Sequence, residues 1–474
     1  MSETLVTADP QVSVEPRAGR RSLAAVLAAV GIPMFMVTLD NLVVTNALPV
    51  IRTELGASLA DLQWFVNAYT LAFASLLLTA TSIGDRLGRR RIFLVGIAIF
   101  TAASAACALA TEPWMLIAAR SIQGFGAAAV MPLSLTLLSS AVPEKMRSAA
   151  IGIWGGISGL GVALGPLIGG AVVEGLSWQW IFWVNVPIGV LVLPFAAWAL
   201  TESHGRAKRL DPLGLVLSAG GVLAVVWGVI HGAGDGWTST GVLTALIGGA
   251  ALLGLLIAWE LRTPDPMLPL RLFRSRAFRV SNTTVFTFSV GVFGSIFLLA
   301  QYFQVVQGLG PLQSGIRTMP WTMAPMVVAP LAGLIVDRVG ARNLLTAGQT
   351  MLAAALAWMA AVTAVDASYL AFVGPFLLGG VGMGLTFAPG ATVVMASATP
   401  EDRAMASGTN STIREVGVAM GVAVLASVFA SYGSYVDPQS FVDGLVPAVW
   451  VGAAIVAVGA LVSRLLPSRI TAAD

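Results

Sequence analysis

The sequence predicts an all-α membrane protein with fourteen transmembrane helices, arranged as two six-helix halves with two helices inserted between them. The 474 residues are 57% hydrophobic and only 10% charged, whereas soluble domains average about 25% charged residues. Fourteen apolar segments are long enough to cross the ~30 Å hydrocarbon core of a bilayer. Sequence motifs of the first half recur in the second half. Hydrocarbon offers no partner to backbone polar groups, so these segments are predicted to be helices.

Each half supplies six of the fourteen segments. They run over approximately 24–50, 62–84, 92–110, 114–139, 149–173, 179–200, 212–232, 240–259, 280–306, 314–336, 343–365, 369–396, 405–432 and 446–466. We therefore divide the chain into a cytoplasmic tail (1–22), an N-terminal half (23–200), an inserted pair with a basic loop (201–279), a C-terminal half (280–466) and a second tail (467–474).

The basic residues indicate the orientation. With a cytoplasmic N-terminus, all but four of the 26 Lys and Arg residues fall in cytoplasmic segments, as the positive-inside rule requires. The exceptions are Arg52 and Arg317 in outer loops, and Arg120 and Arg414 inside helices. Both termini are thus predicted to be cytoplasmic. The first apolar run is too long for a signal-peptide core, so it is predicted to be retained.

An internal repeat relates helices 1–6 to helices 9–14. GDRLGRR at 84–90 is echoed by VDRVGAR at 336–342, and Gly161 is echoed by Gly417. Transporters built from such repeats bind substrate between the halves, near the midplane of the membrane.

Other classes of function lack support in the composition. The net charge is only +3, so no nucleic-acid partner is expected. Cys107 is the single cysteine and the two histidines are His204 and His231, so neither a disulfide framework nor a Cys-based metal site is expected. No cofactor and no nucleophile–base cluster is predicted, and the protein is not expected to be an enzyme.

The stretch from Gly152 to Gly170 is an uncharged, glycine-rich helix. Missing side chains allow neighbouring helices to approach backbone to backbone, and an internal proline should bend the helix. A tightly packed structural helix is one interpretation of this pattern. The motif positions that we single out are Gly152, Gly161, Gly165, Pro166, Gly169 and Gly170.

The spacing of these residues resembles the antiporter motif of major facilitator exporters. Trp-Gln-Trp-Ile-Phe at 178–182 and Asn-Val-Pro-Ile-Gly at 185–189 are similar to the next signature of the fourteen-helix drug:proton antiporter (multidrug efflux) family. The resemblance implies a major facilitator fold in a bacterial cytoplasmic membrane. It also implies export of small hydrophobic compounds, driven by the proton gradient, through alternating access. We expect a monomer, although no residue pattern indicates the oligomeric state.

Two charged residues lie within predicted helices 1 and 4. An acid inside a membrane segment is a functional hypothesis by default, and Asp40 lies about 15 Å below the outer end of helix 1. Arg120, with Gln123 and Gly124, resembles the proton-transfer motif of the family. Desolvation favours a protonated acid and a nearby Arg favours the carboxylate, so switching this contact would change proton affinity. Structural roles for both residues stay open.

Further polar positions are candidates for proton coupling or for the substrate cavity. Arg414 and Glu415 are adjacent in helix 13, and they either neutralise one another or supply a second coupling pair. The predicted cavity positions are Asn41, Gln63, Asn67, Tyr69, Gln123, Met131, Gln301, Gln304 and Asn410.

The loop between helices 2 and 3 resembles the gating loop of the superfamily, with Thr81 at a position where the family has Gly. We expect Asp85 to meet the N-terminus of a neighbouring helix, where the helix dipole favours an acid; a purely topological role of the basic residues is the alternative. The gating positions are Asp85, Arg86, Gly88, Arg89 and Arg90, with Asp337 and Arg338 in the second copy.

The basic loop at 262–279 is either a short amphipathic helix on the inner membrane surface or a solvated linker. Other functions also stay open: a metabolite facilitator or symporter of the same fold, or a membrane sensor or enzyme. The sensor lacks a soluble output domain, and the enzyme lacks a catalytic cluster.

Overall fold

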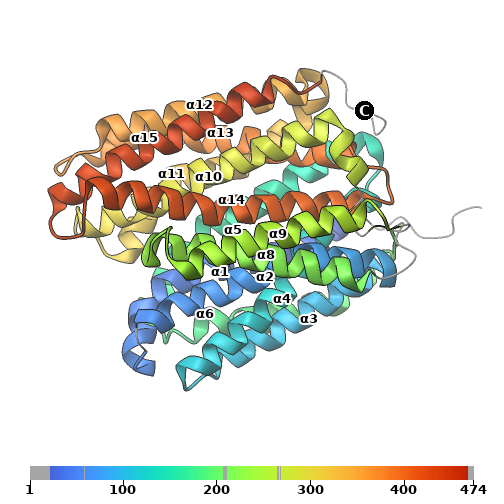
Figure 1. The fold of residues 1–474 in the computed structure, drawn as a ribbon, viewed down its shortest axis with the longest axis horizontal. Coiled ribbons are helices and arrows are strands. Elements are labelled where there is room, and N and C mark those ends of the chain that lie inside the picture. Colours follow the sequence, from blue (N-terminus) through green and yellow to red (C-terminus); the bar gives the residue numbers. More distant parts are fainter. Residues whose placement is uncertain are drawn as a thin grey trace, which may run out of the picture.

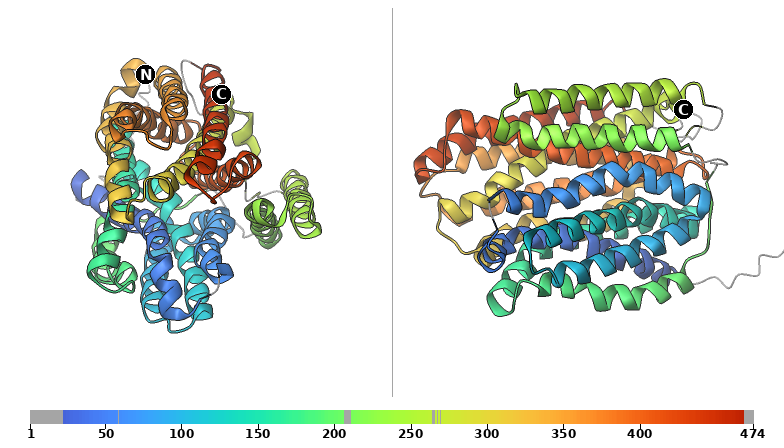
Figure 2. Two further views of the ribbon diagram at one scale, coloured as in Figure 1. Left: turned by 90° about the vertical axis from the view of Figure 1, so that its left-hand side faces the viewer. Right: turned by 60° about the horizontal axis from the view of Figure 1, so that its bottom comes forward.

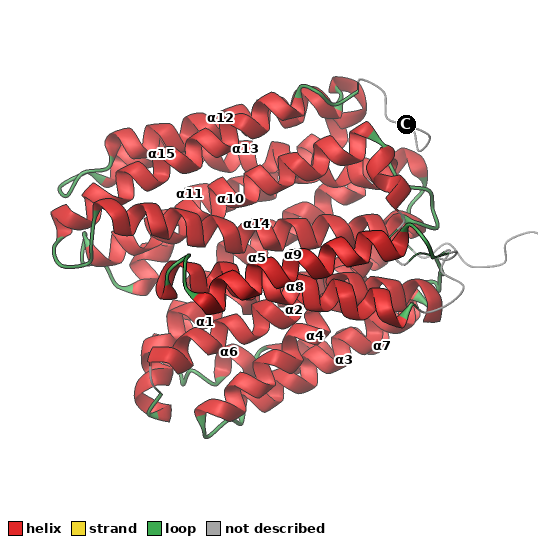
Figure 3. Ribbon diagram, viewed as in Figure 1, coloured by secondary structure: helices red, strands yellow, loops and turns green. Residues whose placement is uncertain are grey.

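The computed structural model describes residues 22–467 except 58, 206–210, 264–265, 267 and 269. Helices, turns and loops make up the described residues, with no strand among them (Figure 3). The helices are α1 (Leu23–Leu55), α2 (Leu59–Leu87), α3 (Arg89–Ala108), α4 (Pro113–Ala141), α5 (Glu144–Gly175), α6 (Trp180–Trp183), α7 (Asn185–Ala199), α8 (Pro212–Asp235), α9 (Thr240–Glu260), η1 (Leu270–Arg274), α10 (Arg276–Val305), α11 (Pro311–Val339), α12 (Ala341–Val362), α13 (Tyr369–Ala396), α14 (Arg403–Tyr432) and α15 (Pro438–Ser463).

The helices run roughly side by side in one bundle (Figure 1). Within the described residues, 13 spans are long and apolar enough to cross a membrane. The glycine-rich α5 is a further long helix of 32 residues. These helices agree with the fourteen apolar segments of the sequence.

The sixth predicted segment is interrupted near its start. A four-residue α6 ends at Trp183 and α7 begins at Asn185. Pro187 has no N–H to donate to the Trp183 carbonyl, so a continuous helix would lose a bond here. The break places Asn185 at the first turn of α7, directed into the N-terminal half, where it matters for the site below.

The internal repeat is visible as repeated packing. In the first half, a Cβ added at Gly161 of α5 would meet the Phe35 carbonyl and the Thr38 side chain of α1. In the second half, a Cβ at Gly417 of α14 would meet the Phe286 carbonyl and a side chain of α10. The same glycine-on-backbone contact therefore joins the first and fifth helices of each repeat.

The halves meet chiefly through two helix pairs, α5 with α11 and α2 with α14, while α13 also contacts α5 and α14 also contacts α4. Gly152 of α5 and Gly333 of α11 face one another so closely that a Cβ on either would come within 3.1 Å of the other's Cα. At the other pair, Leu71 and Ala74 of α2 share an apolar cluster with Ala419 and Ala423 of α14.

The inserted helices α8 and α9 form a pair on the outside of the bundle (Figure 2). The pair contacts α2 and α14 through α8. Asp211 caps α8 by accepting a hydrogen bond from the Gly214 N–H, and it also accepts from Trp259 Nε1 of α9 at 2.9 Å. One carboxylate therefore ties the two inserted helices together at this end.

The described part of the basic loop between α9 and α10 contains the short helix η1 (Leu270–Arg274), as one interpretation of the sequence expected. Leu272 is buried in an apolar cluster that contains residues of both halves. Arg271 contacts Asp402, with Nε at 3.1 Å from Oδ2. The helix α10 begins at Arg276, four residues earlier than predicted, because Ser275 caps its N-terminus by accepting from the Phe278 N–H.

Candidate functional site

Asp40 is the centre of a buried polar cluster inside the N-terminal half. Its side chain accepts from Arg120 Nη1 at 2.6 Å, from Gln123 Nε2 at 2.9 Å and from Asn185 Nδ2 at 2.8 Å. Three helices, α1, α4 and α7, therefore meet at this carboxylate, and α3 joins the cluster because Ser104 accepts from Gln123 Nε2 at 2.7 Å. The acid and the arginine that the sequence singled out are direct partners.

Arg120 is fixed by more than its ion pair. Its Nε donates to the Phe65 carbonyl of α2 at 3.0 Å, and its guanidinium carbon lies 4.3 Å from the centre of the Tyr69 ring. Such a cation–π contact favours the charged guanidinium. The position of α2 is thus tied directly to the arginine that holds Asp40.

The cluster is closed to solvent. Arg120 and Gln123 are fully buried and Asp40 is 2% exposed. Removing one partner of a buried ion pair typically costs about 3–5 kcal/mol, because the remaining charge is left without compensation. Arg120 Nη2 and the Tyr69 hydroxyl are buried without a hydrogen-bond partner among the described residues. They are the polar positions at which the cluster can accept a further partner.

Asn185 and Ser104 were not predicted as site residues. Both are neutral, and neither stands out in an apolar helix without a structure. Asn185 lies in the Asn-Val-Pro-Ile-Gly sequence that supported the family resemblance, and this motif could have marked it as a site residue. No feature of the sequence marks Ser104 in the same way.

Arg414 and Glu415 form a second buried pair at the junction of the halves. Arg414 Nη2 lies 3.2 Å from Glu415 Oε1, and the same nitrogen contacts the sulfur of Met131 on α4. The pair neutralises itself locally and also reaches across to the N-terminal half. Asn410, one turn earlier, donates to Asn282 Oδ1 of α10 at 3.0 Å.

Asp85 makes a different contact from the one expected. Its carboxylate accepts from Arg89 Nε at 2.7 Å, and Arg89 Nη2 donates to the Glu401 carbonyl at 2.8 Å. Arg89 lies one turn beyond Asp85, so its guanidinium comes between the acid and the start of α14. The first gating loop therefore reaches the C-terminal half through Arg89 rather than through a helix dipole.

The second copy of the loop behaves differently because Ala341 replaces the equivalent of Arg89. Asp337 accepts directly from the Ser148 hydroxyl near the N-terminus of α5 at 3.1 Å. This is the kind of contact that was expected for Asp85. Arg338 is exposed. Gly88 and Gly340 occupy equivalent positions with φ of 111° and 86°, where a side chain would be strained.

The remaining loop residues have separate roles. Arg90 Nη1 donates to the carbonyls of Ala197 and Leu200 at the end of α7, and Arg86 is exposed. Glu202 accepts from the backbone N–H groups of Arg90 and Arg91, which caps the N-terminus of α3 with an acid. No pattern in the sequence indicated this cap.

The glycine motif of α5 serves two neighbours. Gly152 and Gly170 face α11, where added Cβ atoms would meet the backbone of Ala329 and Leu312 respectively, whereas Gly161 faces α1. Gly165 and Gly169 are buried. The side chain of Pro166 lies outside the described part of the structure.

Several predicted cavity residues have other surroundings. Gln123 is enclosed within the Asp40 cluster rather than lining a cavity in this conformation. Gln304 is exposed on the surface of α10, and Gln301 accepts from the Tyr435 hydroxyl beyond the end of α14; both lie away from the junction of the halves. Asn41 and Asn67 are half-buried. The side chain of Gln63 lies outside the described residues.

Comparisons with known proteins agree with the fold and the motifs. A sequence profile of the Major Facilitator Superfamily matches residues 30–422 and 321–472. The multidrug resistance protein Stp of Mycobacterium tuberculosis is 39% identical over 87% of this chain and 77% of its own. The tetracenomycin C resistance and export protein of Streptomyces glaucescens is 33% identical over 89% of this chain and 79% of its own. The methylenomycin A resistance protein of Streptomyces coelicolor is 35% identical over 90% of both chains.

A solved structure is similar in fold. The human organic anion transporter MFSD10 superimposes on this chain with a TM-score of 0.65 and 16% sequence identity. The superposition covers 95% of this chain and 100% of the MFSD10 chain. The profile match over most of the chain, the repeated six-helix packing and relatives named for drug resistance and export point to one conclusion. This chain belongs to the drug-efflux transporters of the Major Facilitator Superfamily.

Proposed function

We propose that this protein is a proton-driven antiporter that exports small hydrophobic compounds by alternating access between its two halves. The observation that carries the proposal is the enclosed cluster in which Asp40 pairs with Arg120 inside the membrane. A buried acid with a switchable cationic partner can take up a proton in one conformation and release it in the other.

The link between proton and conformation runs through α2. Arg120 binds the Phe65 carbonyl and packs on the Tyr69 ring, and α2 is one of the helices at the junction of the halves. Protonation of Asp40 would release Arg120 from its ion pair, and the arginine could then shift against α2. We infer that this movement couples proton binding to opening of the junction.

The proposed setting is a bacterial cytoplasmic membrane, with both termini in the cytoplasm and one chain sufficient for transport. The positive-inside distribution supports this orientation. It puts the gating loop at 84–90 on the cytoplasmic side, where Arg89 of the N-terminal half contacts the C-terminal half and Arg271 ties the basic loop to Asp402. In this orientation, the contact of Arg89 with the Glu401 carbonyl supports a conformation that is closed toward the cytoplasm.

Asp40→Asn tests the proposal. The variant keeps a hydrogen-bonding side chain but cannot exchange a proton, so it should insert normally and fail to expel hydrophobic antibiotics or dyes from cells. Asp443→Asn is the matched control, because Asp443 is exposed and bonded to Gln439; its efflux should equal that of the wild type. Uphill efflux by Asp40→Asn at wild-type rate would contradict the proposal.

A further inference from the structure

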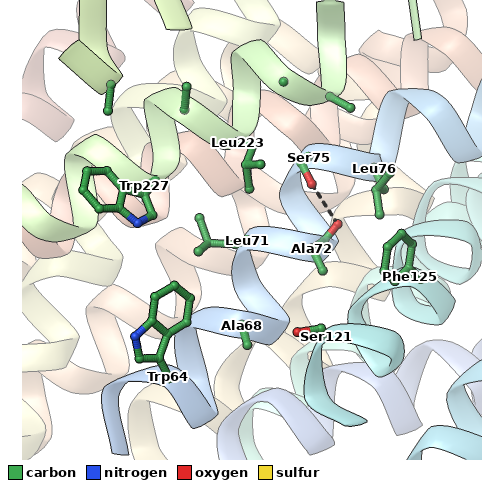
Figure 4. A pocket seen from close by; sticks show the side chains of 14 residues that line it. Trp64, Ala68, Leu71, Ala72, Ser75, Leu76, Ser121, Phe125, Leu223 and Trp227 are labelled. Atoms are coloured by element: carbon green, nitrogen blue, oxygen red, sulfur yellow. Dashed lines mark hydrogen bonds between the residues drawn. The ribbon is translucent and has the colours of Figure 1, made fainter. Parts of the chain in front are cut away.

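An apolar groove lies between the inserted helices and the N-terminal half. It has a cavity volume of about 650 Å³, within the ~300–1,000 Å³ range of small-ligand sites. Its walls are α2, the outer face of α4, and α8 with part of α9 (Figure 4). Because α8 contacts α2 and α14, the groove follows α2 between α4 and the inserted pair.

We propose that this groove is a lipid site that holds one acyl chain of a membrane phospholipid. It runs along α2 from Trp64 to Leu76, about 18 Å at the helical rise of 1.5 Å per residue. Half of a ~30 Å hydrocarbon core is of similar length. The groove therefore extends from one membrane interface to about the middle of the bilayer.

The lining is mostly apolar, and its two serine hydroxyls are already bonded within their own helices. The Ser75 and Ser121 hydroxyls each donate to a carbonyl of their own helix, at 3.2 Å and 3.0 Å (Figure 4 draws the first). The other lining residues are apolar or aromatic. A hydrocarbon chain needs no hydrogen-bond partner, so this lining suits an acyl chain.

One end of the groove suits a lipid headgroup. Trp64 of α2 and Trp227 of α8 flank this end (Figure 4), and His231 stacks on Trp227 with ring centres 4.0 Å apart. Trp64 begins one candidate membrane span (Trp64–Leu87), and Trp227 and His231 lie in the last third of another (Pro212–Gly232), toward the ends of spans where amphipathic rings are enriched. His231 Nδ1 contacts the Trp227 carbonyl at 2.9 Å, leaving Nε2 as the ring atom that can reach a headgroup.

The test uses the full chain purified in mild detergent and then reconstituted in phosphatidylethanolamine–phosphatidylglycerol vesicles. Ala224→Trp places a large ring in the groove. Gly220→Leu is a milder filling, since its new Cβ finds only an ordinary contact of 3.5 Å with Leu252. Gly248→Trp is the matched control on the same inserted pair, because a Cβ there has nothing within 4 Å.

Two measurements decide the proposal. The first measurement is the number of phospholipid molecules that remain bound per chain after purification in detergent, which removes annular lipid. The second uses vesicles that contain a phosphatidylethanolamine with a diazirine in its acyl chain; after illumination, the labelled peptides are mapped. Wild type and Gly248→Trp should retain one phospholipid more than Ala224→Trp and Gly220→Leu, and should be labelled on α2 and α8. Added phosphatidylethanolamine should raise the melting temperature of the wild type more than that of the filled variants.

Equal lipid content and equal labelling in all four proteins would overturn the lipid site, since lipid would then contact the groove no more than any other face. Retention of a hydrophobic dye in the groove, displaced by Ala224→Trp without change in bound lipid, would also overturn it. Both outcomes are independent of Asp40, so they leave the proposed proton coupling to its own test.

Discussion

At the scale of single residues, the charged members of the buried cluster could be predicted from the sequence. Its neutral polar members Asn185 and Ser104 could not. Asp40 and Arg120 stand out because a charge within an apolar helix is costly, and the structure places them 2.6 Å apart. Asn185 completes the same cluster but comes from a helix 145 residues later. Periodicity describes one helix face and carries no information about such distant contacts. The same limit explains Gln304, whose polar side chain marks an exposed position near a helix end.

Asn185→Leu tests whether the hydrogen bonds to the Asp40 carboxylate stabilise the protein, as their short distances indicate. The change removes a donor from Asp40 and from Ser104, and a buried group without its partner costs about 1–3 kcal/mol. We expect a lower melting temperature in detergent and slower transport. Asn343→Leu is the control, because Asn343 is exposed and its side chain donates to the Val339 carbonyl at the end of α11, outside the Asp40 cluster. A melting temperature equal to that of the control would argue against a tightly held carboxylate.

At the scale of helices, hydropathy located the long elements and missed the irregular ones. The break between α6 and α7 follows from Pro187, but a proline is tolerated elsewhere in these helices, as Pro132 in α4 shows. The glycine pattern predicted close approach without naming the neighbour. The structure assigns Gly152 to α11 and Gly161 to α1, so one motif joins α5 both to its own half and to the other half.

Gly152→Ala and Gly155→Ala form a matched pair, since each adds one methyl group to the same helix. At Gly152 the new Cβ would lie 2.8 Å from the Ala329 carbonyl oxygen, whereas at Gly155 the nearest atom is 3.8 Å away. Overpacking costs typically ~1–3 kcal/mol, and here it acts on the junction between the halves. Gly152→Ala should accumulate normally and transport more slowly, and Gly155→Ala should resemble the wild type in the same efflux assay. Equal activity of the two variants would mean that the α5–α11 contact does not limit transport.

At the scale of the whole molecule, the repeat predicted two similar halves, and the structure shows where they differ. The second copy has Ala341 at the position equivalent to Arg89, so Asp337 contacts Ser148 directly. In the first copy, Asp85 instead binds Arg89, which reaches the other half. The groove beside α8 and α9 is formed by inserted helices that the repeat does not include. It could not be predicted, because hydropathy locates a helix but does not indicate which helices it packs against.

Arg89→Ala should weaken the closure of the halves at this end. The Arg89 guanidinium donates both to the Asp85 carboxylate and to the carbonyls of Pro400 and Glu401 in the other half. Spin labels on either side of this contact should move apart, and Asp85→Ala should produce the same change through loss of the arginine's anchor. The control is Arg86→Ala, whose side chain is exposed. Unchanged label distances in Arg89→Ala would show that other contacts hold the halves together.

The central claim is that export is driven by protons carried on Asp40, and proteoliposomes with an imposed pH difference test it most directly. The measurement follows a pH-sensitive dye inside the vesicles while a hydrophobic substrate is added. Added substrate should dissipate the pH difference through the wild-type protein, and Asp40→Asn should leave the pH difference intact while still binding substrate. Substrate movement that neither responds to the pH difference nor dissipates it, or dissipation that persists in Asp40→Asn, would contradict the account.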